Sequence, residues 1–142
     1  MLFAKLHPLL VHLPVGLLVS GAIFELYGKM RNDEIVATAG WFNIRLGFIC
    51  ALVVMVVGFL GVMSLEFSEK SKPFLSKHLL YACSTGFLFM LALIAGKFKS
   101  KIWARWLYCL LISFGLWTAL STGFYGGELV HGFGIATLQV VD

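Results

Sequence analysis

The chain has 142 residues, of which 60% are hydrophobic and only 13% are charged, and its mean hydropathy is +0.93. This composition excludes an ordinary soluble globular domain and is typical of an integral membrane protein. The formal net charge of +4 does not indicate a nucleic-acid partner. The basic residues lie mainly in the short segments between apolar stretches, where they orient a membrane protein.

Four apolar stretches follow one another, at about residues 9–27, 44–65, 78–95 and 104–125. Each is close to the roughly 20 residues that a helix needs to cross the hydrocarbon core. The connections are short, so we predict one all-α domain over residues 1–142, a transmembrane four-helix bundle in up-down-up-down order. Small residues near the end of the first stretch resemble a signal-peptide cleavage region, but we expect this stretch to remain as a helix.

The first stretch opens with HPLLVHLPVGLL, residues 7–18, which places two histidines and two prolines at a membrane boundary. Proline is favoured at the first helical position, so a helix that starts at Pro8 would hold His12 four residues inside. Pro14 would then free the carbonyl of Leu10, which could accept a ring N–H of a ligating histidine and fix its tautomer. Alternatively, the helix starts at Pro14 and the preceding residues are irregular.

Other polar residues occur near or within the stretches. Glu25 lies near the end of the first stretch and Arg45 near the start of the second. They either pair in the membrane or reach the interface separately, and we expect the second.

Cys50, Cys83 and Cys109 occupy three different stretches and no C-x-x-C-H motif is present, which excludes a covalently attached c-type haem. We interpret the cysteines as small buried residues.

The distribution of basic residues predicts the orientation. Seven of the eleven lie around the first and third connections: Lys29, Arg31, Arg45, Lys97, Lys99, Lys101 and Arg105. By the positive-inside rule, both termini and the middle connection should therefore face outward. In a bacterial inner membrane, this side is the periplasm.

All four histidines fall on the outward side of the predicted bundle. If Pro73 begins the third helix as Pro8 begins the first, His12 and His78 lie within ~2 Å of the same depth. They come from helices that are diagonal in a simple square bundle. Two imidazoles that face each other at one depth suit bis-histidine ligation of a haem iron.

Small residues one turn below these histidines would make room for a cofactor. Gly16 follows His12 by four residues, and Ala82 follows His78 by four. Small residues in membrane helices also serve close helix packing, but their concentration at the depth of the histidines favours a cofactor.

His7 and His131 have two interpretations. On a continuous helix His7 points about 140° away from His12 and lies ~7.5 Å shallower, so it would not serve the same iron. Either His7 and His131 ligate a second haem, or His7 caps the helix start or bonds a propionate while His131 lies in a polar loop.

The two ends of the chain resemble a known family. The opening HPLLVHLPVGLL and the closing GGELVHGFG are similar to those of small four-helix bacterial proteins described as predicted membrane proteins of unknown function. These proteins tend to begin on His-Pro-x-x-Val-His-x-Pro and to end near Gly-Gly-x-Leu-Val, and the resemblance spans essentially the whole chain. The matching residues are His7, Pro8, His12, Pro14, Gly126, Gly127, Leu129 and Val130. Where the family often has tyrosine after Leu-Val, this chain has His131.

Family members often occur beside, or fused to, cytochrome c modules, so the resemblance implies an electron-transfer setting and a b-type haem.

The sequence therefore predicts a b-type cytochrome subunit with His12 and His78 as axial ligands and one haem b, or two if His7 and His131 bind a second. It would pass electrons between a periplasmic cytochrome c or a membrane quinol and other membrane subunits, as part of an oxidoreductase complex rather than as an enzyme by itself. Two alternatives remain open. One is a structural subunit without a cofactor, and the other is a copper or zinc site made by three or four histidines.

Overall fold

The computed structural model describes residues 2–98 and 100–135, so Met1, Lys99 and the last seven residues lie outside the description. The described chain consists of helices α1 (Leu2–Leu10), α2 (His12–Arg31), α3 (Glu34–Met63), α4 (Lys72–Gly96) and α5 (Ile102–Gly127), followed by the π-helical turn η1 (Glu128–Gly132). Four spans are long and apolar enough to cross a membrane: Leu2–Arg31, Glu34–Met63, Lys72–Gly96 and Ile102–Gly132. The prediction of an all-α protein with four transmembrane helices is confirmed.

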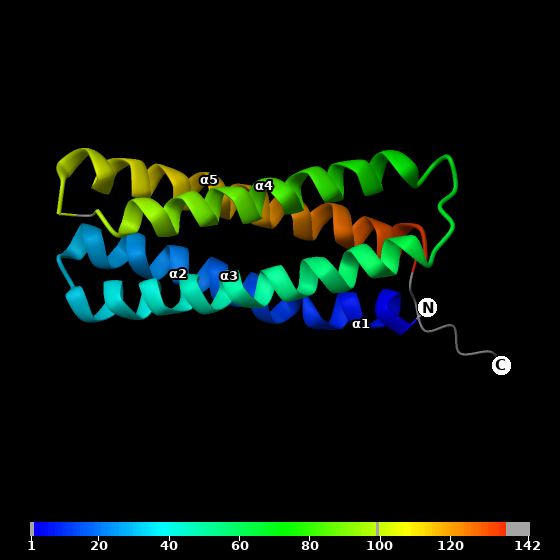
Figure 1. The fold of residues 1–142 in the computed structure, drawn as a ribbon, viewed down its shortest axis with the longest axis horizontal. Coiled ribbons are helices and arrows are strands. Elements are labelled where there is room, and N and C mark those ends of the chain that lie inside the picture. Colours follow the sequence, from blue (N-terminus) through cyan, green and yellow to red (C-terminus); the bar gives the residue numbers. More distant parts are fainter. Residues whose placement is uncertain (1, 99, 136–142) are drawn as a thin grey trace.

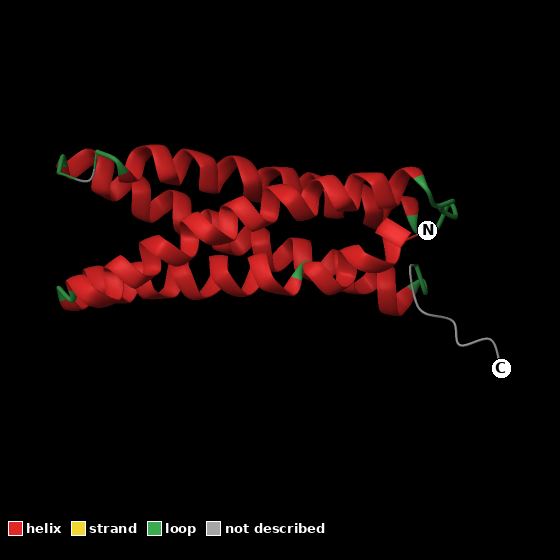
Figure 2. Ribbon diagram, turned by 60° about the horizontal axis from the view of Figure 1, so that its bottom comes forward, coloured by secondary structure: helices red, strands yellow, loops and turns green. Residues whose placement is uncertain are grey.

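The spans lie side by side as two helical hairpins, one formed by α1, α2 and α3 and the other by α4 and α5 (Figure 1). The turn at residues 32–33 and the connection at residues 97–101 lie at one end of the molecule. The connection between α3 and α4 lies at the other end, together with the start of α1 and the end of α5 (Figure 2). We call this second end the histidine end, because α1, the first residue of α2, the first turns of α4 and η1 carry the four histidines.

The first span begins earlier than either predicted start. Helix α1 begins at Leu2, so Pro8 lies inside α1 and Pro14 lies inside α2. Proline at position 14 has no N–H to donate to the carbonyl of Leu10, and the helix is interrupted at Val11. Val11 keeps helical dihedral angles (φ −63°, ψ −25°), so α1 and α2 continue in register as one span. Both predicted starts are wrong, because a helix can continue past the hydrocarbon into the headgroup region.

The first hairpin packs through glycines on both of its long helices. Gly21 and Gly28 on α2 are buried, as are Gly40 and Gly47 on α3, and each pair is spaced by seven residues. A Cβ atom added to Gly40 would lie 2.5 Å from the backbone nitrogen of Glu25. The two backbones are therefore in direct contact, as small residues permit in membrane helices.

We expect Gly40→Ala to destabilise the protein by about 1–3 kcal/mol, because the added methyl group can be accommodated only by moving α2 away from α3. The matched control is Gly123→Ala, where no atom lies within 4 Å of the added Cβ. Thermal unfolding of both variants in detergent measures the effect. Equal melting temperatures for the two variants would contradict the backbone contact.

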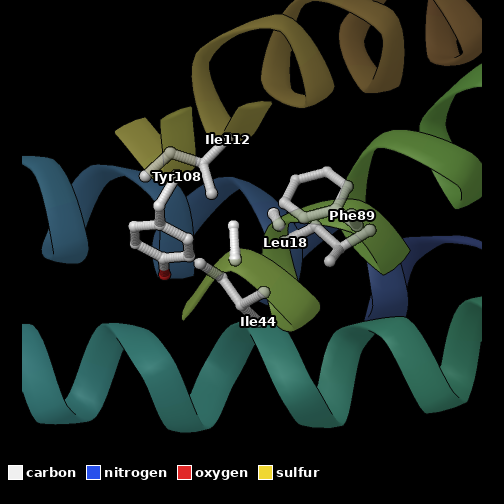
Figure 3. Close-up of a cluster of buried hydrophobic side chains, with 7 residues drawn as sticks. Leu18, Ile44, Phe89, Tyr108 and Ile112 are labelled. Carbon is white, nitrogen blue, oxygen red and sulfur yellow. The ribbon is translucent and has the colours of Figure 1, made fainter. Parts of the chain in front are cut away.

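All four long helices contribute to the central core. Leu18 of α2, Ile44 of α3, Phe89 of α4 and Ile112 of α5 pack together with Tyr108 (Figure 3). Each of these side chains is at most 3% exposed. The core joins the two hairpins near the middle of the spans and leaves the histidine end to be organised by other contacts.

Glu25 does not reach the interface as expected. The side chain of Glu25 is 1% exposed, whereas Arg45 is exposed, so only Arg45 lies on the surface of the bundle. The Cγ atom of Glu25 lies 3.0 Å from the position that a Cβ of Gly40 would occupy. The missing side chain of Gly40 thus provides the space in which this carboxyl-bearing side chain is buried.

The outer surface of the bundle is apolar. Large hydrophobic side chains are exposed along every long helix, including Ile23, Val56, Phe87 and Phe114, which are 50–61% exposed. Such an extended apolar surface requires an apolar surrounding. Together with the four spans, it identifies a multi-pass membrane protein.

Candidate functional site

Two of the four histidines meet between the hairpins at the histidine end. The ring centroids of His7 and His78 lie 6.1 Å apart and their planes are nearly perpendicular, at 89°. His7 belongs to α1, which packs on α3, and His78 belongs to α4, which packs on α5. Each hairpin therefore contributes one imidazole, and both rings are half-buried.

Each ring is held by a hydrogen bond to a backbone carbonyl of its own hairpin. The Nδ1 of His7 lies 3.1 Å from the carbonyl oxygen of Val54, and the Nδ1 of His78 lies 3.0 Å from that of Thr122. A carbonyl oxygen can only accept, so Nδ1 is the protonated nitrogen in both rings. In the neutral imidazole, Nε2 then keeps a free lone pair. Metal-ligating histidines are typically oriented by this kind of bond.

A glycine supports each ring, four residues after the accepting carbonyl. A Cβ atom added to Gly58 would lie 2.6 Å from Cε1 of His7, and one added to Gly126 would lie 3.1 Å from Cε1 of His78. Each imidazole thus lies directly against a helix backbone. The same arrangement of histidine, carbonyl and glycine occurs once in each hairpin, so both rings are positioned by the fold and not by flexible loops.

Threonine hydroxyls hold α4 against α5 below His78. Thr85 donates to the hydroxyl of Thr118 at 3.0 Å, and Thr122 donates to the carbonyl of Thr118 at 2.8 Å. Thr85 and Thr118 are 7% and 4% exposed. Thr122 also provides the carbonyl that accepts from His78, and its own hydroxyl bond lies within α5. The Thr85–Thr118 bond therefore joins the two helices on which the position of the ring depends.

The structure places the other predicted site residues elsewhere. His12 is exposed, and its Nδ1 lies 3.2 Å from the carbonyl oxygen of Leu9 in its own helix. His131 is exposed in η1. Gly16 is exposed with no atom within 4 Å of an added Cβ, and Ala82 is half-buried. His78 is therefore found in the pair as expected, but its partner is His7 and not His12.

The repeat of buried residues explains this correction. In α2, the buried positions include residues 14, 18, 21, 25 and 28, with alternating spacings of three and four. Continued backward, the same pattern reaches residue 7, and Ala4 is indeed buried. His12 falls outside the pattern and faces away from the bundle. The part of this pattern visible in the sequence is the spacing of Gly21 and Gly28, which continued backward in steps of seven reaches His7 once the helix is taken to begin before Pro8.

A metal site made by three or four histidines has no counterpart among the described residues. In residues 2–98 and 100–135, no group of three or more His, Cys, Asp or Glu side chains could hold a metal ion. The described site is a pair of imidazoles.

Comparison with known proteins identifies the family. The family model described as "Predicted membrane protein (DUF2231)" matches residues 4–139, and the chain belongs to this family. The resemblance of its two ends to a family of predicted membrane proteins is thereby confirmed, and no function is assigned to the family. No curated protein and no solved structure matches the chain.

Proposed function

We propose that this protein is a b-type cytochrome that holds one haem between His7 and His78 and transfers single electrons in a bacterial membrane. The observation that carries the proposal is the pair of imidazoles with centroids 6.1 Å apart, in which each Nδ1 donates to a backbone carbonyl and each Nε2 is the nitrogen that would bind iron. The axial pair differs from the one predicted from the sequence in its first member.

The donor set fits a six-coordinate haem iron. An imidazole nitrogen binds a transition metal at about 2 Å, so two rings on opposite sides of one iron have centres about 6 Å apart. The observed separation of the His7 and His78 centroids is 6.1 Å.

A bound haem would supply a reversible one-electron iron couple. The residues of this chain would bind and orient it. His7 and His78 would be the residues that hold the haem iron, and a haem held by two histidines would supply electron transfer rather than chemistry at an open site. The carbonyls of Val54 and Thr122 would keep both ligands in the required tautomer.

The charge distribution supports an orientation with the histidine end outward. The basic residues Lys29, Arg31, Lys97, Lys101 and Arg105 lie at the opposite end, at the 32–33 turn and around the 97–101 connection. By the positive-inside rule this basic end faces the cytoplasm, and both termini face the periplasm of a bacterial inner membrane. A haem between His7 and His78 would then lie near the outer face. There it could exchange electrons with a periplasmic cytochrome c, a membrane quinol or other membrane subunits.

The test is a reduced-minus-oxidised visible spectrum of the protein purified from its native membrane, combined with a pyridine haemochrome assay. We expect a b-type spectrum and one haem per chain, because His12 and His131 are both exposed and do not form a second buried pair. Two haems per chain would contradict the single site. A flat spectrum, also after addition of haem, would overturn the proposal in favour of a structural subunit without a cofactor.

A further inference from the structure

A polar pocket lies at the basic end of the bundle, far from the histidines. Its volume is about 230 Å³, and it is lined by Gly28, Lys29, Asn32, Glu34 and Arg105. Lys29 is in the last turn of α2, and Arg105 is in the first turn of α5. The pocket thus brings together basic side chains from both hairpins.

The pocket has an excess of positive charge. In residues 2–98 and 100–135, neither Lys29 nor Arg105 forms an ion pair. Glu34 is the single carboxylate that lines the pocket. The neighbouring carboxylate of Asp33 accepts the backbone N–H groups of Ile35 and Val36 and caps α3. Two cations against one carboxylate favour an anionic ligand.

The position of the pocket indicates which kind of molecule carries the anionic group. Trp103 and Trp106 are 58% and 68% exposed in the same part of α5, and tryptophan is enriched at the level of lipid headgroups. Met30 and Ile35, next to residues that line the pocket, are 82% and 84% exposed. A ligand that bears both a phosphate and acyl chains would match the basic pocket and the apolar surface around it.

We propose that Lys29 and Arg105 bind the phosphate of an anionic phospholipid at this end of the bundle. The lysine contributes a compact charge, and the guanidinium group contributes paired N–H donors suited to phosphate oxygens. The lipid would connect the two hairpins where the central core does not reach. This site does not depend on the presence of a haem.

The experiment measures quenching of tryptophan fluorescence by brominated lipids. The protein is placed in phosphatidylcholine vesicles that contain increasing fractions of brominated phosphatidylglycerol or brominated phosphatidylcholine, at about 0.5 M salt to screen general charge attraction. We expect phosphatidylglycerol to bind several-fold more tightly than phosphatidylcholine. The double variant Lys29→Gln/Arg105→Gln should lose this preference and bind the two lipids equally well.

The matched control is Lys97→Gln/Lys101→Gln, which removes two charges at the same end from exposed residues that do not line the pocket. The control should keep the preference of the wild-type chain for phosphatidylglycerol. Equal losses in both double variants would show general attraction to an anionic membrane and overturn the site. No preference in the wild-type chain, or displacement of the lipid by millimolar inorganic phosphate, would overturn phospholipid as the ligand.

Discussion

Replacing His7 with alanine is expected to abolish the b-type spectrum, and replacing His78 is expected to do the same. Each substitution removes one of two neighbouring imidazoles whose ring centres are 6.1 Å apart. An iron with one remaining protein ligand binds weakly and changes its spin state. His12→Ala should leave the spectrum unchanged, because this side chain is exposed and bonds within its own turn. Haem per chain and the reduced-minus-oxidised spectrum measure all three.

Loss of haem must be separated from loss of the fold. The variant His7→Gly, titrated with free imidazole, should regain the six-coordinate spectrum because the added ligand occupies the position of the missing ring. Helix content by circular dichroism should match that of the wild-type chain. If His12→Ala loses haem and His7→Ala keeps it, the pair seen in the structure does not bind iron. If all three single variants keep haem, neither His7 with His78 nor His12 with His78 binds the iron.

Gly58→Ala should weaken haem binding by about 10–100-fold, without a change in any ligand. The added Cβ would lie 2.6 Å from Cε1 and 2.7 Å from Nδ1 of His7. The ring would have to move, which would break its hydrogen bond to the carbonyl of Val54. Gly126→Ala should have a smaller effect, because its Cβ would lie 3.1 Å from the ring of His78 and a shift of a few tenths of an ångström would relieve the contact.

The measurement is a haem titration of the purified apoprotein, followed by its visible spectrum. Gly123→Ala is the control, since it adds the same methyl group to α5 with no atom within 4 Å. We expect affinity to decrease in the order Gly123→Ala, Gly126→Ala, Gly58→Ala. Haem binding by Gly58→Ala that equals that of the control would show that the position of His7 against α3 does not matter for the cofactor.

The sequence by itself determined the class of protein and the end of the molecule at which the histidines lie. Four apolar stretches of sufficient length predict four spans without knowledge of how they pack, because the cost of burying polar groups in lipid acts on each segment separately. The same four spans, taken to run in alternating directions, also place all four histidines at one end. The sequence also located the start of the helix that carries His78, because Pro73 lies in the first turn of α4.

Only the tertiary structure decided which histidine lies beside His78 and where Glu25 lies. Five residues separate His7 from His12, a rotation of about 140° between them, so one points into the bundle and the other away from it. The rotation of this helix about its axis is set by the contacts of the whole span with α3. Pro8 and Pro14 gave misleading predictions of the helix start because each lies within a helix. The burial of Glu25 likewise depends on a glycine of another helix, Gly40, and contacts between distant segments cannot be derived from the hydropathy of either one.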